Sequence, residues 1–476
     1  MLPWARQSGL LGGVILLASS CALVRPDRER AAPVDLPGEF SSDGGRAVST
    51  NRWWTSFDSP ALDALVEQAL ASNFDIRKAW ARLDQARELA IQAGADRWPG
   101  LNLDASARRA KTISTVTGAP VAATADTFAL GVAASYEVDL WGRVSAGAKA
   151  ARYDWQASRG DLETAALSVA AELAETWFAA IEQQAQLRLL NDQLEVSRSY
   201  RELTELRFQQ GQASALDVYQ QRQQEASVRA QIPPVEARLA VLKNALAVLT
   251  GKAPGRLDAE IADRLPDAPA RPGAGLPADL LQNRPDVRAA AARLRAADER
   301  VHAAVANRLP TLRLTGGAGY QNAELEDLFD DWIWNLAAGL TGPILDGGRR
   351  ASEARRTRAA AEEALNAYGQ TLLKALREVE DALVQEDRQR ELLDRQREQL
   401  DLARQTLTEA RARYRAGLSD YLPVLTALQT TQILERGAIA AHRQWLSYRL
   451  QLHRALGGDW TRELQNPKSE YRNSKQ

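Results

Sequence analysis

The second half of the chain carries the same succession of short motifs as the first half, 206 to 211 residues later. Phe74–Ala79 (FDIRKA) corresponds to Pro285–Ala290 (PDVRAA) at an offset of 211. Arg207–Gly211 (RFQQG) corresponds to Arg413–Gly417 (RYRAG) at an offset of 206. We therefore expect two copies of one unit, at residues 61–251 and 278–457, which are too elongated to be separate globules and share one structure.

The offset shortens by five residues inside each copy. Pro99 and Gly142 are 43 residues apart, whereas their counterparts Pro310 and Gly348 are 38 apart. Insertions are tolerated best in surface loops. The difference predicts a surface loop between Pro99 and Gly142.

Two segments in each copy alternate apolar and polar residues with a period of two, which is typical of half-buried strands. These segments lie in predicted β-hairpins at 98–141 and 309–346. Each strand is expected to be about ten residues long, which suits a tilted membrane-spanning strand. The alternative is a pair of hairpins in a soluble sandwich, but the sequence supplies no second sheet to cover the apolar face.

Four strands are too few to close a barrel. Open strand edges in hydrocarbon leave backbone groups unpaired, at a cost of several kcal/mol each. Other copies of the chain must therefore complete the wall, and periodicity alone does not set their number.

Most of the remaining sequence predicts very long helices. Residues 143–210 and 349–416 contain no proline, and roughly 67 residues at ~1.5 Å each extend about 100 Å. Gly211 and Gly417 are placed to end these helices. Return helices are predicted at 214–250 and 420–456, the first broken or kinked at Pro233 and Pro234. A connector rich in proline and glycine fills 252–277.

The N-terminus predicts export. Residues 1–20 have the basic start, apolar stretch and small residues of a secretory signal peptide. Cys21 follows it and is the only cysteine of the 476 residues, which favours a use other than a disulfide. The alternative is an ordinary signal peptide with a stray thiol. Beyond this leader no apolar run reaches eighteen residues, so we expect no transmembrane helix.

Composition argues against several other classes of function. Sixty basic and sixty-one acidic residues leave a net charge of −1, which gives no basis for nucleic-acid binding. The histidines, His302, His442 and His453, are dispersed, and no spacing of ligands supports a metal site. We expect no catalytic residue, no metal and no cofactor.

In its motifs the chain resembles a TolC-family outer-membrane factor of the OprM/NodT-like lipoprotein branch. The resemblance covers nearly the whole chain after the leader and rests on motifs that occur in order. These motifs are Ser19–Cys21 (SSC), Trp53–Phe57 (WWTSF), Asn283–Arg288 (NRPDVR), Gly342–Gly348 (GPILDGG) and Arg413–Leu418 (RYRAGL).

The resemblance implies a mixed α and β membrane protein. In such a protein three copies form a 12-stranded β-barrel in the outer membrane, continuous with a periplasmic α-helical barrel. It implies that Cys21 carries diacylglycerol and N-palmitate. Segments 21–60 and 252–277 then contribute to an equatorial region, and 458–476 forms a C-terminal tail.

The resemblance also implies partners: outer-membrane lipid, a periplasmic adaptor (membrane fusion protein) and an inner-membrane pump, which we expect to be of the RND class. The tips of the helical hairpins are the expected adaptor-docking surface. The residues singled out there are Gly211, Leu216, Asp217, Val218, Gly417, Leu418, Ser419 and Tyr421.

Asp420 is the predicted gate, because relatives carry an acidic residue near this turn that faces the channel axis, one position earlier. A plain helix N-cap is the alternative role for this side chain. The expected function is passive efflux of small molecules such as drugs through an outer-membrane exit duct. The alternatives are the duct of a type I protein-secretion system and a periplasm-spanning structural coiled coil.

Overall fold

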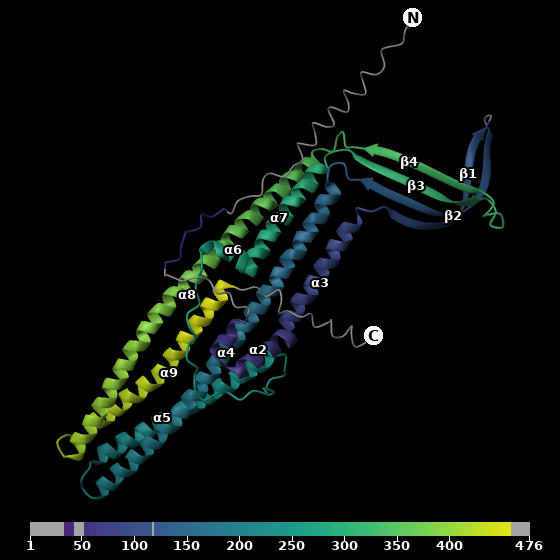
Figure 1. The fold of residues 1–476 in the computed structure, drawn as a ribbon. Coiled ribbons are helices and arrows are strands. Elements are labelled where there is room, and N and C mark those ends of the chain that lie inside the picture. Colours follow the sequence, from purple (N-terminus) through teal and green to yellow (C-terminus); the bar gives the residue numbers. More distant parts are fainter. Residues whose placement is uncertain (1–32, 42–51, 117–118, 458–476) are drawn as a thin grey trace. The chain divides into compact units, whose positions relative to one another are not determined.

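The computed structural model describes residues 33–41, 52–116 and 119–457. Contacts divide them into two compact units, each with segments from both sequence repeats (Figure 1). We call Leu83–Ser158 with Ala289–Gly369 the strand unit, and Val34–Arg82, Arg159–Arg288 and the residues from Gln370 onward the hairpin unit. Cys21 and the 458–476 tail lie outside the described residues.

Helices and strands follow each other in the same order in both repeats. In the first repeat they are η2 (Trp53–Phe57), α2 (Pro60–Ser72), α3 (Phe74–Ala95), β1 (Gly100–Val116), β2 (Ala119–Val138), α4 (Arg143–Gln209) and α5 (Ala215–Leu249). In the second they are η3 (Pro277–Asp279), α6 (Leu280–Asn283), α7 (Pro285–Ala306), β3 (Thr311–Asn322), β4 (Trp332–Thr341), α8 (Arg349–Arg415) and α9 (Leu422–Leu456).

The strand unit contains one antiparallel sheet in the order β1-β2-β3-β4. The predicted strands are confirmed, but β1 and β2 are longer than expected, with 17 and 20 residues. The prediction of a longer surface loop is wrong. The first hairpin has only residues 117 and 118 between its strands, whereas nine residues, 323–331, connect β3 and β4. The extra residues of the first copy therefore lengthen its strands.

The apolar faces of these strands are exposed in the single chain. Leu101 and Leu103 of β1 are 72% and 74% exposed, and Leu336 of β4 is 78% exposed. The described residues hold a single sheet, so no second sheet covers this face. The sandwich alternative does not apply to this part of the chain.

Carboxylates begin the long helices where the strands end. Asp139 accepts hydrogen bonds from the backbone N–H groups of Val144 (3.0 Å) and Ser145 (2.8 Å). Asp346 accepts one from Arg350 (3.2 Å) in the second repeat. Both caps satisfy N–H groups that the first helical turn leaves unpaired and favour the positive end of the helix dipole. Each strand-to-helix junction is therefore fixed locally.

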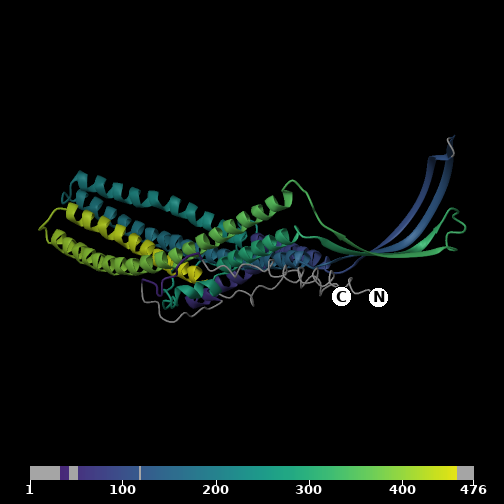
Figure 2. The same cartoon turned by 90° about the horizontal axis from the view of Figure 1, so that it is seen from above.

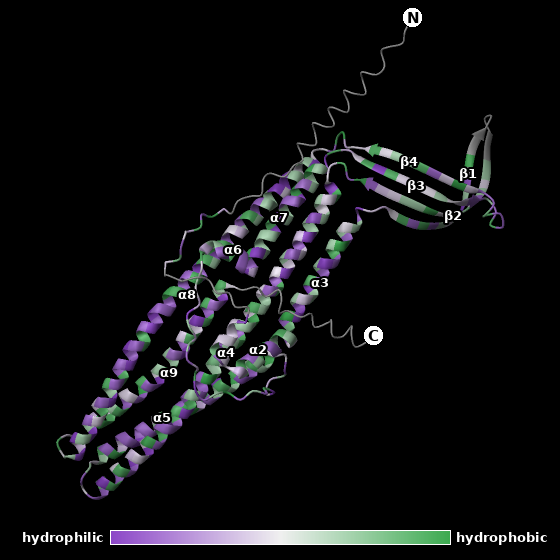
Figure 3. Cartoon of the chain, in the orientation of Figure 1, coloured by the Kyte–Doolittle hydropathy of each residue, from purple (hydrophilic) through white to green (hydrophobic). Residues whose placement is uncertain are grey.

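The long helices match the prediction closely. Helices α4 and α8 have 67 residues each, and α5 and α9 have 35 each (Figure 2). One 18-residue window of α4 is apolar enough to cross a membrane, with a mean hydropathy of 1.2, but 61% of it is buried inside the protein. This burial is typical of a core helix. Polar and apolar residues are interspersed along these helices (Figure 3).

The sequence predicts a break or a kink at Pro233 and Pro234; the helix is not broken there, because α5 continues through both prolines. Both proline side chains are exposed, so water can hydrate the carbonyls that lose their N–H partners. Ile232 and Val235 on either side pack against a buried cluster that includes Leu190 of α4. Packing on α4 therefore holds the helix together at this point.

Aromatic side chains fill the core of the hairpin unit. Trp53, Trp54 and Phe57 of η2 are 1% exposed or less. Phe57 contacts Phe178 of α4 with ring centroids 5.1 Å apart. His453 of α9 stacks on Trp53 at 5.9 Å with an interplanar angle of 21°. This cluster joins the N-terminal segment to the first long helix and the last return helix.

The buried His453 makes this core sensitive to acid. Burial, reinforced by nearby Arg449, lowers the pKa of the imidazole from 6.5 to about 4. The unfolded chain therefore binds a proton between pH 6.5 and 4 while the folded chain does not, so stability falls as the pH falls through this window. The pKa difference corresponds to a loss on the order of 3 kcal/mol. We predict that His453→Phe removes this slope in thermal unfolding between pH 7 and 4; an unchanged slope would assign it to other groups.

The end of each return helix closes against the start of its own repeat, and both repeats use the same backbone contact. Gly251 has a φ of +76° and Gly457 a φ of +78°. A Cβ on Gly251 would lie 2.7 Å from the carbonyl oxygen of Ser72, and one on Gly457 would lie 2.6 Å from that of Asn283. Only glycine meets both requirements.

Side chains reinforce the two closures by different chemistry. Asn73 donates to the carbonyl oxygen of Leu249 at 3.0 Å. Arg284 occupies the corresponding place, donates to the carbonyl oxygen of Ala455 at 2.9 Å and also pairs with Asp286 at 2.7 Å. The first repeat is therefore closed by a hydrogen bond from an amide side chain. The second is closed by a hydrogen bond from a guanidinium group, which is also held in an ion pair.

We predict that Gly251→Ala lowers the free energy of unfolding by about 3 kcal/mol or more, because the methyl group meets a backbone carbonyl and the φ is positive. Gly255→Ala is the matched control. Its φ is +81°, but a Cβ there meets nothing within 4 Å, so only the backbone strain of about 1 kcal/mol applies. Thermal unfolding of the detergent-purified protein measures both. Equal losses of unfolding free energy in the two variants would show that the contact between Gly251 and the Ser72 carbonyl is unimportant.

Candidate functional site at the hairpin tips

The first hairpin tip is a tight, fully capped turn. Gly211 has a φ of +74°, and the N–H of Gln212 donates to the carbonyl oxygen of Arg207 at 2.8 Å. Ser214 then caps α5. Its hydroxyl accepts from the Asp217 N–H at 3.2 Å, and Asp217 accepts from the Ser214 N–H at 2.9 Å. The reciprocal cap gives Asp217 a structural role in shaping this tip.

The second tip ends α8 in the same way but starts α9 differently. Gly417 has a φ of +72°, and the N–H of Leu418 donates to the carbonyl oxygen of Arg413 at 2.9 Å. Tyr421 is the N-cap residue of α9 and makes no capping hydrogen bond with its side chain. Asp420 is exposed and is not the N-cap. The capping alternative for this carboxylate is therefore wrong.

The predicted docking residues divide into exposed and buried side chains. Leu216 and Leu418 are 64% and 71% exposed. Val218 and Tyr421 are 8% and 2% exposed, so these two side chains are core residues and do not present a docking surface. The prediction failed for them because tip position alone does not show which face of the turn packs inward.

A recess that the sequence did not predict lies beside the second tip. Its volume is about 410 Å³, and it is lined by α8 and α9 residues, among them Ala403, Thr406, Leu422 and Pro423. Leu422 is 55% exposed. The second tip therefore presents an apolar recess, which we call the tip recess, and two exposed leucines, Leu418 and Leu422.

Tyr421 instead joins the two hairpins. Its hydroxyl donates to Gln221 Oε1 at 2.5 Å, and its ring lies 5.4 Å from that of Tyr414. Val424, Leu425 and Leu428 surround it in one buried cluster. Burial raises the pKa of the Tyr421 hydroxyl, so the hydroxyl stays protonated and remains a donor at physiological pH.

Glutamines continue this connection along the helices. Gln193 of α4 donates to the carbonyl oxygen of Gln432 at 3.3 Å and accepts from Arg436 at 2.5 Å. Gln224 of α5 donates to Gln432 Oε1 at 2.9 Å. The glutamines' spacings of three and seven residues, as in 221 and 224 or 186 and 193, are the signal that they share a face.

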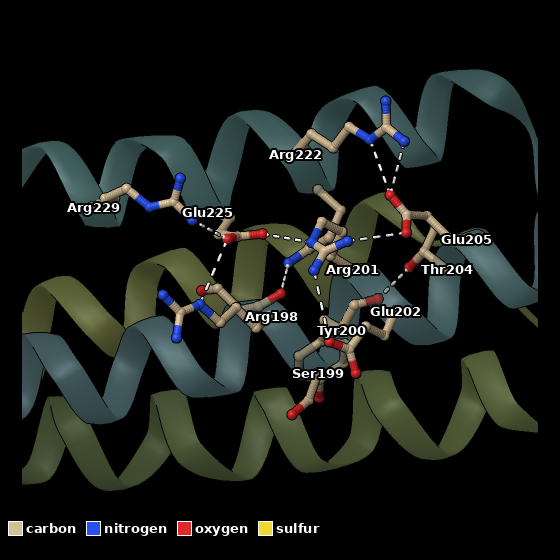
Figure 4. Close-up of polar contacts among 12 residues, drawn as sticks. Arg198, Ser199, Tyr200, Arg201, Glu202, Thr204, Glu205, Arg222, Glu225 and Arg229 are labelled. Atoms are coloured by element: carbon tan, nitrogen blue, oxygen red, sulfur yellow. Dashed lines mark hydrogen bonds and ion pairs between the residues drawn. The ribbon is translucent and has the colours of Figure 1, made fainter.

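An ion-pair network lies between α4 and α5 (Figure 4). Glu225 is 7% exposed and accepts from Arg201 and from Arg229, each at 2.6 Å. Arg201 also pairs with Glu205 at 3.0 Å, and Arg222 pairs with Glu205 at 2.9 Å. The hydrogen bond from Arg222 lowers the pKa of Glu205, with Arg201 adding to it. Through these ion pairs the two carboxylates hold the two helices of the first hairpin together.

The described residues contain no group of three or more His, Cys, Asp or Glu side chains arranged to hold a metal ion. The predicted tip residues are instead surrounded by caps, apolar contacts and hydrogen bonds between helices. Such an arrangement is suited to binding and to movement of whole helices.

Comparison with known proteins identifies the family. The sequence matches the outer membrane efflux protein family twice, over residues 65–252 and 276–458, so each repeat matches the family pattern separately. The chain belongs to this family. The predicted resemblance is confirmed, and the family consists of channels rather than enzymes.

Individual relatives agree over nearly the whole chain. The pyoverdine export outer membrane protein OpmQ of Pseudomonas aeruginosa is 32% identical over 463 residues, 94% of this chain and 97% of the relative. OprJ of the same organism is 30% identical over 94% of this chain and 95% of the relative. The solved structure of the outer-membrane channel OprN has a TM-score of 0.86 at 28% identity, covering 92% of this chain and 99% of that one. VceC of Vibrio cholerae has a TM-score of 0.82 at 29% identity, covering 87% and 100%.

These likenesses establish an efflux channel of the outer membrane, with strand hairpins and long helical repeats as its fold. Members of this family act with an adaptor and an inner-membrane pump, which places the chain in a system of three components.

Proposed function

We propose that three copies of the chain close into one conduit that carries small molecules from an inner-membrane pump across the outer membrane. The observation that carries this proposal is the four-stranded sheet with two free edges. Strands β1 and β4 are each paired on one side only within the described residues. In hydrocarbon an unpaired edge costs several kcal/mol for each backbone group, so neighbouring copies must supply the missing partners.

Three copies supply twelve strands, which exceeds the roughly eight strands of the smallest closed barrels. A head-to-tail contact of β1 on one copy with β4 on the next is heterologous and closes into a ring when the rotation is right. The exposed leucines and tryptophans of β1 and β4 then face lipid.

The cargo we propose is small molecules such as drugs. Relatives are named for the export of pyoverdine and for the efflux of toluene. The pump that we propose for this chain is of the RND class. Cys21 is the proposed site of lipidation, with diacylglycerol and N-palmitate anchoring the chain to the outer membrane.

The adaptor is proposed to dock at the tips. Exposed apolar side chains in water mark interaction sites, and here Leu216, Leu418 and Leu422 lie at the turns with the tip recess beside the second one. A helical hairpin of the adaptor would place apolar side chains in such a recess, as amphipathic helices do in grooves.

If the chain forms this conduit, a charged side chain has a different effect on trimer assembly on each of the two faces of β4. Leu336→Arg places a cation on the lipid face, at a cost of about 2–4 kcal/mol near the middle of the membrane. Asn335→Arg is the matched control on the opposite face. We expect the first variant to reduce the amount of trimer in outer-membrane fractions and the second to leave it unchanged. Equal loss in both, or a stable wild-type monomer in detergent, would contradict the proposal.

Asp420 is the proposed gate. It is exposed and makes no hydrogen bond with any described residue, and three copies of it would form a ring of carboxylates. We predict that Asp420→Ala increases channel leak, measured as conductance in bilayers or sensitivity of cells to large antibiotics. Glu409→Ala is the control, because it removes an exposed carboxylate from the same hairpin away from the turn. If both variants behave like the wild type, the gate is formed by other residues.

A further inference from the structure

The strand unit contains a recess between α3 and α4 with a volume of about 470 Å³. Four cations line it: Arg87 and Arg97 from α3 and the residues after it, and Lys149 and Arg152 from α4. Ile91 and Trp155 provide apolar lining. We call this site the basic recess. A water molecule occupies roughly 30 Å³ of liquid, so the volume holds about fifteen waters and has room for a molecule larger than a simple ion.

The cations of the basic recess are poorly neutralised by the protein. Lys149 has a distant partner, Glu299 at 3.9 Å. Arg87, Arg97 and Arg152 make no ion pair with any residue that the structure describes. Other arginines of α4 are matched by carboxylates; Arg143, for example, forms a two-pronged pair with Glu137 at 2.9 Å. Converging guanidinium groups without carboxylate partners fit an anion, and phosphate is the one that their planar fork suits best.

The basic recess lies next to the ends of the strands. Arg97 precedes the first residue of β1 by three positions, and Trp98 between them is 76% exposed, as expected of an aromatic residue at a membrane interface. Lys149 is six residues into α4, or about 9 Å along the helix axis. The polar interface of a bilayer leaflet is roughly 5–7 Å thick, so Lys149 lies just beyond it, and a long cationic side chain reaches headgroups from such a position.

The loop that joins β3 to β4 is acidic and lies away from the helices. The loop 323–331 lies at the far ends of β3 and β4 and carries Glu324, Glu326, Asp327, Asp330 and Asp331. The ends that join the helices carry the basic recess. The cations therefore lie on the side from which the long helices leave the membrane.

We propose that the basic recess binds the headgroup of an anionic phospholipid from the periplasmic leaflet of the outer membrane. The lipid phosphate lies between Arg97 and Arg152, and the glycerol and the upper acyl carbons lie against Ile91 and Trp155. An amphiphilic anion matches both the cations and the apolar lining, and phospholipid is the amphiphile always present beside the strand ends. The inference rests on the proposed crossing of the outer membrane by the strands.

The experiment is native mass spectrometry of the delipidated full-length protein, titrated with phosphatidylglycerol or with zwitterionic phosphatidylethanolamine. We expect preferential binding of phosphatidylglycerol. The double variant Arg97→Gln/Arg152→Gln should weaken this binding roughly a hundredfold or more, since loss of each charge-assisted contact weakens binding about tenfold or more. Arg358→Gln is the control, an exposed arginine of the same unit outside the recess.

A second pair of variants tests the cavity without changing charge. Gly94 lines the recess, and a Cβ there meets nothing within 4 Å, so Gly94→Leu fills the space and leaves all four cations. Gly147→Leu is the matched control, equally unobstructed on α4 but outside the lining. We expect only Gly94→Leu to weaken phosphatidylglycerol binding.

Three results would overturn the proposal: recess variants that bind like the wild type, equal binding of both lipids, or displacement of phosphatidylglycerol by inorganic phosphate alone, which indicates a site for soluble anions. The same spectra report the number of chains in the assembly. If the spectra show a monomer, and Gly94→Leu still weakens its binding of phosphatidylglycerol, the trimeric conduit is contradicted and the lipid site is supported.

Discussion

Every helical hairpin of this protein depends on a contact between backbones at its base. At Gly251 and Gly457 the chain passes so close to the carbonyls of Ser72 and Asn283 that a single carbon atom does not fit. A helix of 35 residues extends about 50 Å, so a small change of direction at its base moves its tip by many ångströms. The close contact at the base therefore fixes the position of the functional tips. It occurs in both repeats although the reinforcing side chains differ, Asn73 in one and Arg284 in the other.

Polar contacts dominate where the two hairpins meet beyond this base. Gln193, Gln224 and Gln432 exchange hydrogen bonds across the interface, and Tyr421 adds one at the tip. Each such bond contributes about 1 kcal/mol net, less than burial of a leucine. Gln432 Nε2 is buried without a partner in the described part of the chain. The interface is thus specific in its geometry without being strongly adhesive.

Much of the architecture follows from local sequence. Apolar residues that recur every two positions predicted the strands, and those that recur every three to four positions predicted the long helices. Gly211 and Gly417 predicted the turns. These signals depend only on neighbouring residues in the sequence. Tertiary packing decided the rest. Ile232 and Val235 pack where α5 continues through two prolines, and the extra residues of the first copy lengthen strands because partners exist to pair them. Which helices pack together decides the burial of Val218 and Tyr421, the glutamine contacts and both recesses. The spacing of apolar residues does not predict this packing.

The unequal strands have a consequence for the rim of the proposed barrel. Strand β1 has 17 residues and β4 has 10, so a β4 neighbour leaves the distal part of β1 without a partner. Counted from Gly100, that part begins at Ala110 and carries Lys111; Arg108 and Arg109 lie directly before it, and Arg109 is held across the hairpin by Asp126 at 2.6 Å. Charged side chains on a free edge discourage pairing with foreign strands. In a trimer, three such unpaired strand ends would extend beyond the barrel at the cell surface. Their charged side chains would keep strands of other proteins from pairing with them.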